Sequence, residues 1–543
     1  SWGGFNSLQV AFRRPKALKA IITLCSTVDR YTEDIHYKGG CLLNENLGWG
    51  ATMLSYSSRP PDPLIVGKKW KKMWLERLKN QPHLSDIWLK HQKRDKYWKH
   101  GSVCEDYSKL ETPILAIGGW GDAYKNAVPE LVKNAKAKGI IGPWVHKYPH
   151  FAVPKPQIGF LQEAIRWWDR WLKEIDNGCE TDPDYRVYVM KGEPPKSSYN
   201  FRDGYWIKED RWQSKAIKNK KLFLNSNNVL SLSNKKDKCQ LGIIDSPQHC
   251  GLKGGEYCAI WLGPELPGDQ RLDDAFSLCF DTKALNLEED IVGSPELTVT
   301  LEANSPNGQL AVRLCDVFPD GTSSRITYGI LNLRFRESLD SPKNIPLGEE
   351  FTVKIKLDHI AYKLPKGNKL RVSLSNAYWP LVWPVNNPAK LVVKEGYLSL
   401  PLRQSATSDE WVFPESVASK PWQGKEIRKP HNKRQVLFDE ATDEVFLDIE
   451  DDFGSYKDIK NKLVMSSTAR EKWSIHPHDP LSAKGETHWT EERSRGDWSI
   501  RTETFSSMTS DKSYFYLKAR VEAYEKAKLI FTKKMESKIK RVL

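Results

Sequence analysis

The sequence predicts an α/β domain followed by two β-rich domains, and three observations support this fold class. Short apolar runs alternate with helical patterns over residues 1–178, an order typical of a parallel sheet with helices on its faces. From residue 183 onward, short strand-like runs are separated by turn clusters such as Pro319-Asp-Gly321, as in β-sandwiches. The chain of 543 residues is also longer than one hydrophobic core usually supports.

The first domain is expected over residues 1–178. Apolar residues three or four apart predict helices, and short apolar runs bounded by turns predict buried strands. Helices are therefore expected at 5–14, 127–135 and 160–175, and strands at 18–25, 112–117 and 140–141. We expect the apolar face of the last helix to be buried, and it consists of Leu161, Ala164, Ile165, Trp168, Leu172 and Ile175.

Residues 49–108 interrupt this alternation and predict a helical cap. A proline cluster at 59–63 breaks the chain, and a helical run rich in tryptophan, lysine and leucine follows it. The 21 tryptophans of the chain suit either apolar and sugar-like pockets or sandwich cores, and the second use is the commoner one. A cap over the strand ends would place some of them around a substrate; the candidates are Trp70, Trp74, Trp88 and, from the loop after 112–117, Trp120.

The remainder of the chain predicts two β domains. Residues 183–405 are expected to form a jelly-roll β-sandwich, with strands at 185–190, 221–224, 297–301, 310–317 and 370–374. A less distinct domain boundary is expected at 404–422. Residues 406–543 are expected to form a second β module with a hairpin at 488–501 and a strand at 513–523.

Charge and cysteine content narrow the classes of partner. The net charge of +14 is spread along the chain and mixed with acidic residues, which indicates a solvated surface rather than a nucleic-acid footprint. The basic stretch 518–543 suits either an acidic partner or a charged edge strand. Nine scattered cysteines without a C-x-x-C pair argue against a zinc site and favour a reducing, cytoplasmic compartment. A Cys250–Cys258 disulfide fits the spacing but is not required.

No apolar run reaches the roughly 18 residues of a membrane span, so no membrane association is expected. A signal peptide stays open, because the segment before residue 1 is not in the sequence.

Three residues that follow predicted strands or turns suggest a nucleophilic hydrolase. Ser1 precedes Trp2-Gly3-Gly4 and a helix, the second half of a G-x-S-x-G nucleophile elbow; glycines there allow close backbone approach. Asp122 and His146 follow the strands 112–117 and 140–141, and the order Ser, Asp, His is that of α/β-hydrolases. Each has a plainer interpretation: Ser1 is simply the first residue, Asp122 is a helix cap, and His146 is a packed histidine with His150 as a rival.

Several motifs in order extend this interpretation to a family. Ser1-Trp-Gly-Gly4, Gly119-Trp-Gly-Asp122, Gly142-Pro-Trp-Val-His146, Leu272-Asp-Asp-Ala275 and Leu314-Cys-Asp-Val-Phe-Pro-Asp-Gly321 resemble the CocE/NonD hydrolases, relatives of X-Pro dipeptidyl-peptidases (peptidase family S15), cocaine esterase and α-amino acid ester hydrolases. The resemblance covers residues 1 to about 405 and is looser beyond.

The resemblance implies an α/β-hydrolase domain followed by a jelly roll, and acyl transfer without metal or cofactor. By motif it makes Ser1 the nucleophile, Asp122 the acid and His146 the general base, with the Trp2 backbone N–H as one oxyanion donor. The family's second donor, a tyrosine hydroxyl, precedes the nucleophile. Because one such donor typically contributes about 10²–10³ in kcat, we expect the chain beginning at Ser1 to be inactive by itself and its complete parent to be active.

Two other classes of function stay open. An N-terminal-nucleophile hydrolase would use the α-amine of Ser1 as its base, although such enzymes usually have stacked antiparallel sheets. A non-catalytic carbohydrate- or protein-binding protein with a degenerate hydrolase part is the second alternative.

The expected substrate is a small ester, amide or short peptide, and a homo-oligomer is compatible with the sequence. A substrate with a free amine would need a carboxylate near its acyl group. The predicted cap offers Glu76 and Asp86, although surface charges of this kind are usually solvated.

Overall fold

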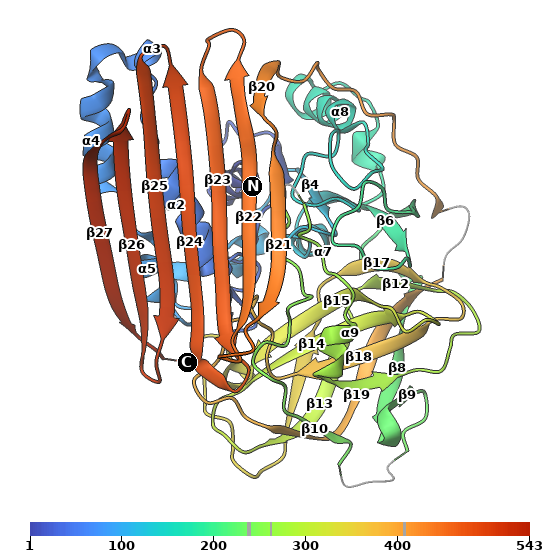
Figure 1. Cartoon of the computed structure of the whole chain (residues 1–543). Helices are drawn as coiled ribbons and strands as arrows, with labels where there is room; N and C mark the ends of the chain where they lie inside the picture. The colour runs from blue at the N-terminus through green and yellow to red at the C-terminus, as the bar shows by residue number, and fades with distance from the viewer. Residues whose placement is uncertain (236–239, 261–262, 405–408, 543) are drawn as a thin grey trace.

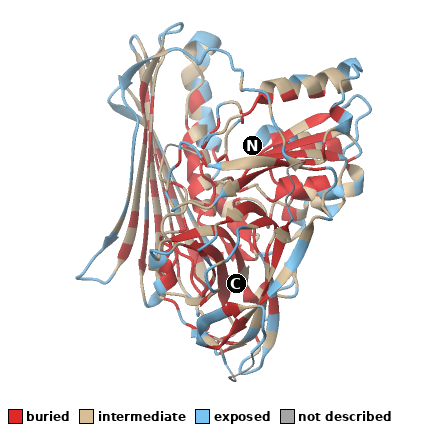
Figure 2. Cartoon of the chain, turned by 90° about the vertical axis from the view of Figure 1, so that its right-hand side faces the viewer, coloured by how far each residue is buried: buried red, intermediate tan, exposed pale blue. Residues whose placement is uncertain are grey.

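The computed structural model describes residues 1–235, 240–260, 263–404 and 409–542. An α/β region, a β-sandwich and a large C-terminal antiparallel sheet lie side by side (Figure 1). Buried residues concentrate in the strands of the α/β region and the sandwich and in the helices between them and the C-terminal sheet (Figure 2). The predicted fold class is confirmed.

The α/β region is built on a parallel sheet whose strands pair in the order β1–β4–β5–β6. Its elements are α1 (Trp2–Phe12), β1 (Ile21–Leu24), β4 (Ile114–Gly119), α7 (Ala127–Asn134), β5 (Ala137–Gly142), α8 (Phe160–Lys173), β6 (Tyr185–Lys191) and β7 (Gly204–Glu209). Leu8 and Ala11 of α1 are fully buried. The carboxyl ends of β4 and β5 therefore lie at one edge, where α/β sheets place ligands.

Strand β6, which the sequence assigns to the second domain, joins the α/β region to the sandwich. It pairs in parallel with β5 and, at Met190 and Lys191, with the sandwich strand β17 (Ile360–Leu364), and β7 pairs with β6. The expected buried face of α8 is wrong: Ile165 and Leu172 are 59% and 60% exposed. Glu163 is buried instead, because it forms an ion pair with Arg186 at 2.8 Å, and a buried charge needs a partner.

Between β1 and β4 the chain forms a short hairpin and the predicted cap. The elements are β2 (Tyr37–Lys38), β3 (Cys41–Leu42), α2 (Glu45–Ser57), α3 (Pro63–Val66), α4 (Trp70–Asn80), α5 (Leu84–Leu89) and α6 (Lys96–Lys99). Asp62 accepts a hydrogen bond from Leu64 N at the start of α3, with Pro63 at its first position, a favourable helix start. Helices α2, α4 and α5 pack against the C-terminal sheet (Figure 1).

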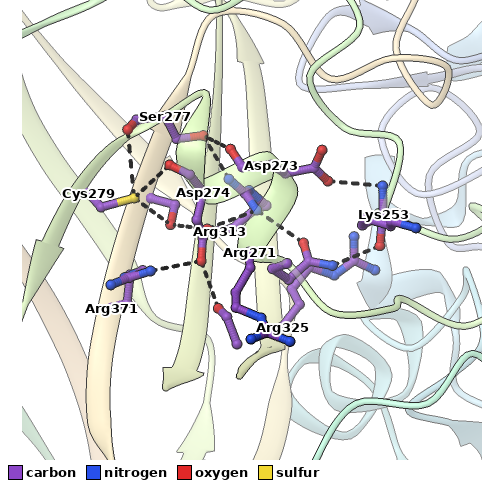
Figure 3. A network of polar contacts seen from close by, with 12 residues as sticks. Lys253, Arg271, Asp273, Asp274, Ser277, Cys279, Arg313, Arg325 and Arg371 are labelled. Atoms are coloured by element: carbon purple, nitrogen blue, oxygen red, sulfur yellow. Dashed lines mark hydrogen bonds and ion pairs between the residues drawn. The ribbon is translucent and has the colours of Figure 1, made fainter. Parts of the chain in front are cut away.

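The sandwich follows β7. Its elements are β8 (Ile217–Asn225), β9 (Val229–Ser231), β10 (Gly242–Ile244), α9 (Arg271–Ala275), β11 (Leu278–Asp281), β12 (Glu289–Gly293), β13 (Glu296–Ala303), β14 (Gln309–Val317), β15 (Ser323–Asn332), β16 (Phe351–Lys356), β17 (Ile360–Leu364), β18 (Lys369–Ser375) and β19 (Leu391–Arg403). A buried polar network ties α9 to these strands (Figure 3): Asp274 lies 3.1 Å from both Arg313 and Arg371.

The C-terminal module is an eight-stranded antiparallel sheet. Its strands are β20 (Gly424–Arg428), β21 (His431–Phe438), β22 (Val445–Asp458), β23 (Val464–His476), β24 (Asp479–Arg495), β25 (Trp498–Ser510), β26 (Tyr514–Glu525) and β27 (Lys528–Lys540). The predicted hairpin is confirmed by the pairing of Arg495 with Trp498 across Gly496, whose φ is +56°. The basic C-terminal stretch contains the edge strand β27.

The eight cysteines that the structure describes are free thiols, Cys250 and Cys258 among them. Within the described residues, none of the helices is both long and apolar enough to cross a membrane.

Candidate active site

The loops after β4 and β5 are held together and bring Asp122 and His146 into contact. Trp120 N donates to Gly142 O and Gly121 N to Trp144 O, each at 2.9 Å. A Cβ at Gly119 would lie 2.1 Å from Trp144 O, so only glycine permits this approach. His146 Nδ1 lies 3.1 Å from Asp122 Oδ1.

The environment of Asp122 favours its ionised form. The residue is fully buried. Burial raises the pKa of Asp122, but the charge of His146 and the hydrogen bond from it outweigh this effect and hold that pKa well below its ordinary value. An ionised carboxylate only accepts hydrogen bonds. His146 Nδ1 is therefore the donor, which leaves Nε2 as the second functional atom of the ring.

Ser1 and His146 line the same cavity, which has a volume of about 370 Å³. Ser1 occupies the N-cap position of α1, and its side chain makes no capping hydrogen bond there. A Cβ at Gly4 would lie 2.8 Å from the backbone of Leu24, whereas nothing lies within 4 Å of one at Gly3. Close packing of α1 on β1 therefore requires glycine at position 4 only. The rival His150 stacks on Phe160, with ring centroids 5.5 Å apart, and does not pair with Asp122.

The tryptophan predictions for the pocket need correction. Trp2 and Trp88 line the cavity. Trp74 is buried among residues of the C-terminal sheet, and Trp70 packs on that group, because the sheet covers the outer side of the cap. Trp120 points the other way, and its indole N–H donates to Tyr188 O at 2.8 Å.

The two cap carboxylates, Glu76 and Asp86, lie away from the cavity, which agrees with the expectation that charges of this kind are usually solvated. Asp86 pairs with Lys90 at 2.8 Å, and Glu76 is exposed. Neither lines the cavity within the part of the chain that the structure describes.

Sequence reasoning missed the carboxyls that do line the cavity, Asp34 and Glu45. Burial raises the pKa of Asp34, and Tyr124 OH donates to it at 3.2 Å. Burial raises the pKa of Glu45 to about 8, and the Glu471 and Glu265 carboxylates add to the rise. No spacing marks either residue. The one local signal for Asp34 is its hydrogen-bond partner Tyr124, which lies two residues after the predicted site residue Asp122.

Two thiols lie close to the Asp122 carboxylate. Cys258 Sγ donates to Asp122 Oδ1 at 3.6 Å. Ligand atoms of Cys25, Asp122 and His146 lie within 4.8 Å of one another, so this group could hold a metal ion. However, burial and the Asp122 charge raise the pKa of the Cys25 thiol well above its ordinary value. The thiol is therefore protonated in this structure, in which His146 and Asp122 contact each other directly at 3.1 Å.

Two family models match separate parts of the chain. Residues 1–148 match the family described as X-Pro dipeptidyl-peptidase (S15 family), and residues 177–418 match the X-Pro dipeptidyl-peptidase C-terminal non-catalytic domain. The chain belongs to the S15 family of hydrolases. The match over residues 1–148 contains Ser1, Asp122 and His146. The C-terminal sheet, from Gly424 to Lys540, lies outside both matches.

Individual relatives of this S15-family chain lie at low identity. Cocaine esterase from Rhodococcus sp. (strain MB1 Bresler) is 24% identical over 443 residues, which are 73% of this chain and 75% of that protein.

Solved structures share the fold. An aminopeptidase from the marine sediment archaeon Thaumarchaeota archaeon has a TM-score of 0.56 at 16% identity, covering 74% of this chain and 75% of that one. An α-amino acid ester hydrolase has a TM-score of 0.55 at 17% identity, with 74% and 75% covered. A CocE/NonD family hydrolase from Staphylococcus aureus has a TM-score of 0.54 at 16% identity, with 74% and 70% covered.

Proposed function

We propose that this S15-family hydrolase cleaves a small ester or amide through an acyl-serine intermediate on Ser1. The observation that carries the proposal is the buried, ionised Asp122 bound to His146 at 3.1 Å beside a cavity that Ser1 also lines. A serine hydroxyl needs such a base to become a nucleophile.

The residues would divide the chemistry as follows. His146 Nε2 takes the proton of Ser1 as Oγ attacks the acyl carbon, and Asp122 stabilises the resulting imidazolium. Trp2 N–H donates to the developing oxyanion; as a first-turn group of α1 it has no intrahelical acceptor. The imidazolium then protonates the leaving alcohol or amine. Water, activated by the same imidazole, cleaves the acyl-serine and releases the acid.

The cavity supports a substrate with an apolar or aromatic acyl group. Its apolar lining includes Trp2, Phe5, Ile35, Trp49, Met53, Leu84, Trp88 and Ile260. Asp34 and Glu45 add two carboxyl groups at this wall, which favours acyl groups with a hydrogen-bond donor or an amine. An X-Pro or other short N-terminal peptide and an aminoacyl ester both meet that description.

A fluorophosphonate probe tests the mechanism directly. Labelling of the protein expressed from its whole reading frame should map to the peptide containing Ser1, and Ser1→Ala should remove both the label and aryl-ester hydrolysis. His146→Ala should slow labelling, whereas Asn6→Ala, a neighbour in the same cavity, should still be labelled.

The same experiment separates the alternatives. A protein that is folded, unlabelled and inactive on aminoacyl, X-Pro and aryl esters would be a binding protein. Loss of labelling on adding residues before Ser1 would instead indicate an N-terminal nucleophile.

A further inference from the structure

A second cavity, of about 110 Å³, lies behind the loops that carry Asp122 and His146. Gly121 and Pro143 line it from the α/β region, and strand β15 lines it from the sandwich. Tyr257 lines this cavity, while the next residue, Cys258, lines the active-site cavity. A single stretch of backbone therefore separates the two.

Three cationic side chains line the second cavity: Lys125, Arg202 and Arg325. Arg202 pairs with Glu193 at 2.8 Å. Lys125 lies 3.6 Å from Asp358, but Lys38 lies closer to the same carboxylate, at 2.5 Å. The other acidic residue of the lining, Glu256, is paired with Arg434. The carboxylates around the cavity are thus already neutralised.

The positive charge of Arg325, in contrast, is not balanced by a carboxylate among the described residues. Its guanidinium donates to Tyr378 OH and lies 4.4 Å from the centroid of the Tyr328 ring. Within the described residues, no carboxylate lies inside the 4.0 Å ion-pair distance of Arg325. Its charge also acts on Lys125: burial lowers the pKa of Lys125, the Asp358 carboxylate opposes that effect, and the positive charges of Lys38 and Arg325 add to the lowering, so that the net direction is downward. Mutual repulsion of this kind is relieved by an anion.

Tyr257 supplies an independent observation. It is 4% exposed, and its hydroxyl has no hydrogen-bond partner within the described residues. Burial raises the pKa of Tyr257 well above its ordinary value, so the hydroxyl keeps its proton and can donate. A buried polar group without a partner is destabilising, and this one calls for a ligand that accepts hydrogen bonds.

We propose that this cavity binds a small oxyanion, of the phosphate or carboxylate class, through Arg325, Lys125 and Tyr257. The arginine fork matches two oxygens of such an anion, and the ammonium and hydroxyl can meet the others. The small volume admits a compact anion rather than a second substrate. The site is separate from Ser1, so the inference does not depend on the proposed reaction.

Inorganic phosphate is the probe. Calorimetric titration at constant ionic strength, with chloride as the balancing anion, should give one site per chain. Arg325→Gln should weaken phosphate binding at least tenfold, because a charge-assisted hydrogen bond contributes about 1.5–3 kcal/mol. Lys125→Met should weaken it as well. The matched control is Arg271→Gln, an exposed arginine of the sandwich that pairs with Asp269, which should bind as the wild type does.

Two results would overturn the inference: wild-type protein that binds no phosphate at millimolar concentration, or an equal affinity in Arg325→Gln and Arg271→Gln, which would place the anion elsewhere. If Arg325→Gln fails to fold by circular dichroism, Arg325→Lys keeps the charge but loses the fork, and it should show an intermediate affinity. Acetate in place of phosphate distinguishes a carboxylate-selective site from a phosphate-selective one, and either supports the proposal.

Discussion

Replacing Asp122 with asparagine isolates the electrostatic part of the proposed mechanism. The carboxylate is fully buried and 3.1 Å from His146 Nδ1. Two unit charges at that separation interact by about 5 kcal/mol at an effective dielectric constant of roughly 20, and about 1.4 kcal/mol corresponds to a tenfold change in rate. Asp122→Asn should therefore lower kcat about 10³–10⁴-fold. Asparagine also lets Nδ1 accept a hydrogen bond, which holds the imidazole in the wrong tautomer.

The assay is steady-state hydrolysis of an aryl ester, with thermal unfolding to confirm that the variant is folded. A second His–Asp pair in the chain provides the control: His91 Nδ1 lies 2.6 Å from Asp95, in the cap and outside the lining of the cavity. Asp95→Asn should leave kcat within about twofold. A loss of less than tenfold in Asp122→Asn, or an equal loss in both variants, would refute the assigned role of Asp122.

Three further predictions concern the pocket and the stability of the fold. Trp88→Ala should raise KM by removing a cavity wall, whereas Trp74→Ala should leave KM unchanged and lower the free energy of unfolding by about 3–5 kcal/mol, as denaturant titration would measure; an unchanged KM in Trp88→Ala would contradict its position. The pKa of Glu45 is raised to about 8, so the folded state holds its proton longer than the unfolded state, and wild-type stability should fall as the pH rises from about 4.5 through 8. Glu45→Gln should not show this fall. If the unfolding free energies of the wild type and of Glu45→Gln change with pH in parallel, Glu45 is not the group responsible. Arg313→Met should destabilise the sandwich by about 3–5 kcal/mol, because it leaves the buried Asp274 short of a counter-charge; a midpoint of chemical unfolding equal to that of Arg271→Gln would rule out this account.

Much of the fold could be read from local patterns. Buried strands appear as short apolar runs, and β1, β4 and β5 lie within about three residues of the predicted ranges. The contact between His146 and Asp122 was also accessible, because parallel strands bring their carboxyl ends to one edge. The buried face of α8 could not be predicted in this way: Ile165 and Leu172 have the apolar spacing of a buried stripe but are exposed. A helical period identifies a stripe, and the partners available in space decide whether it is buried.

The sequence by itself determined the order of elements and the Ser–Asp–His order, because these depend on neighbours along the chain and on motif spacing. It marked both Gly3 and Gly4, and only the contact of α1 with Leu24 of β1 decided that Gly4 is the one that must be glycine. Only the tertiary structure decided which tryptophans meet the cavity, since the residues of the C-terminal sheet that pack on Trp74 lie more than 400 positions after it in the chain and occupy one side of the cap. It also decided that Glu45 lines the active-site cavity and that Arg325 lacks a counter-charge among the described residues. These features depend on contacts between residues that are far apart in the chain, so no local sequence pattern reveals them.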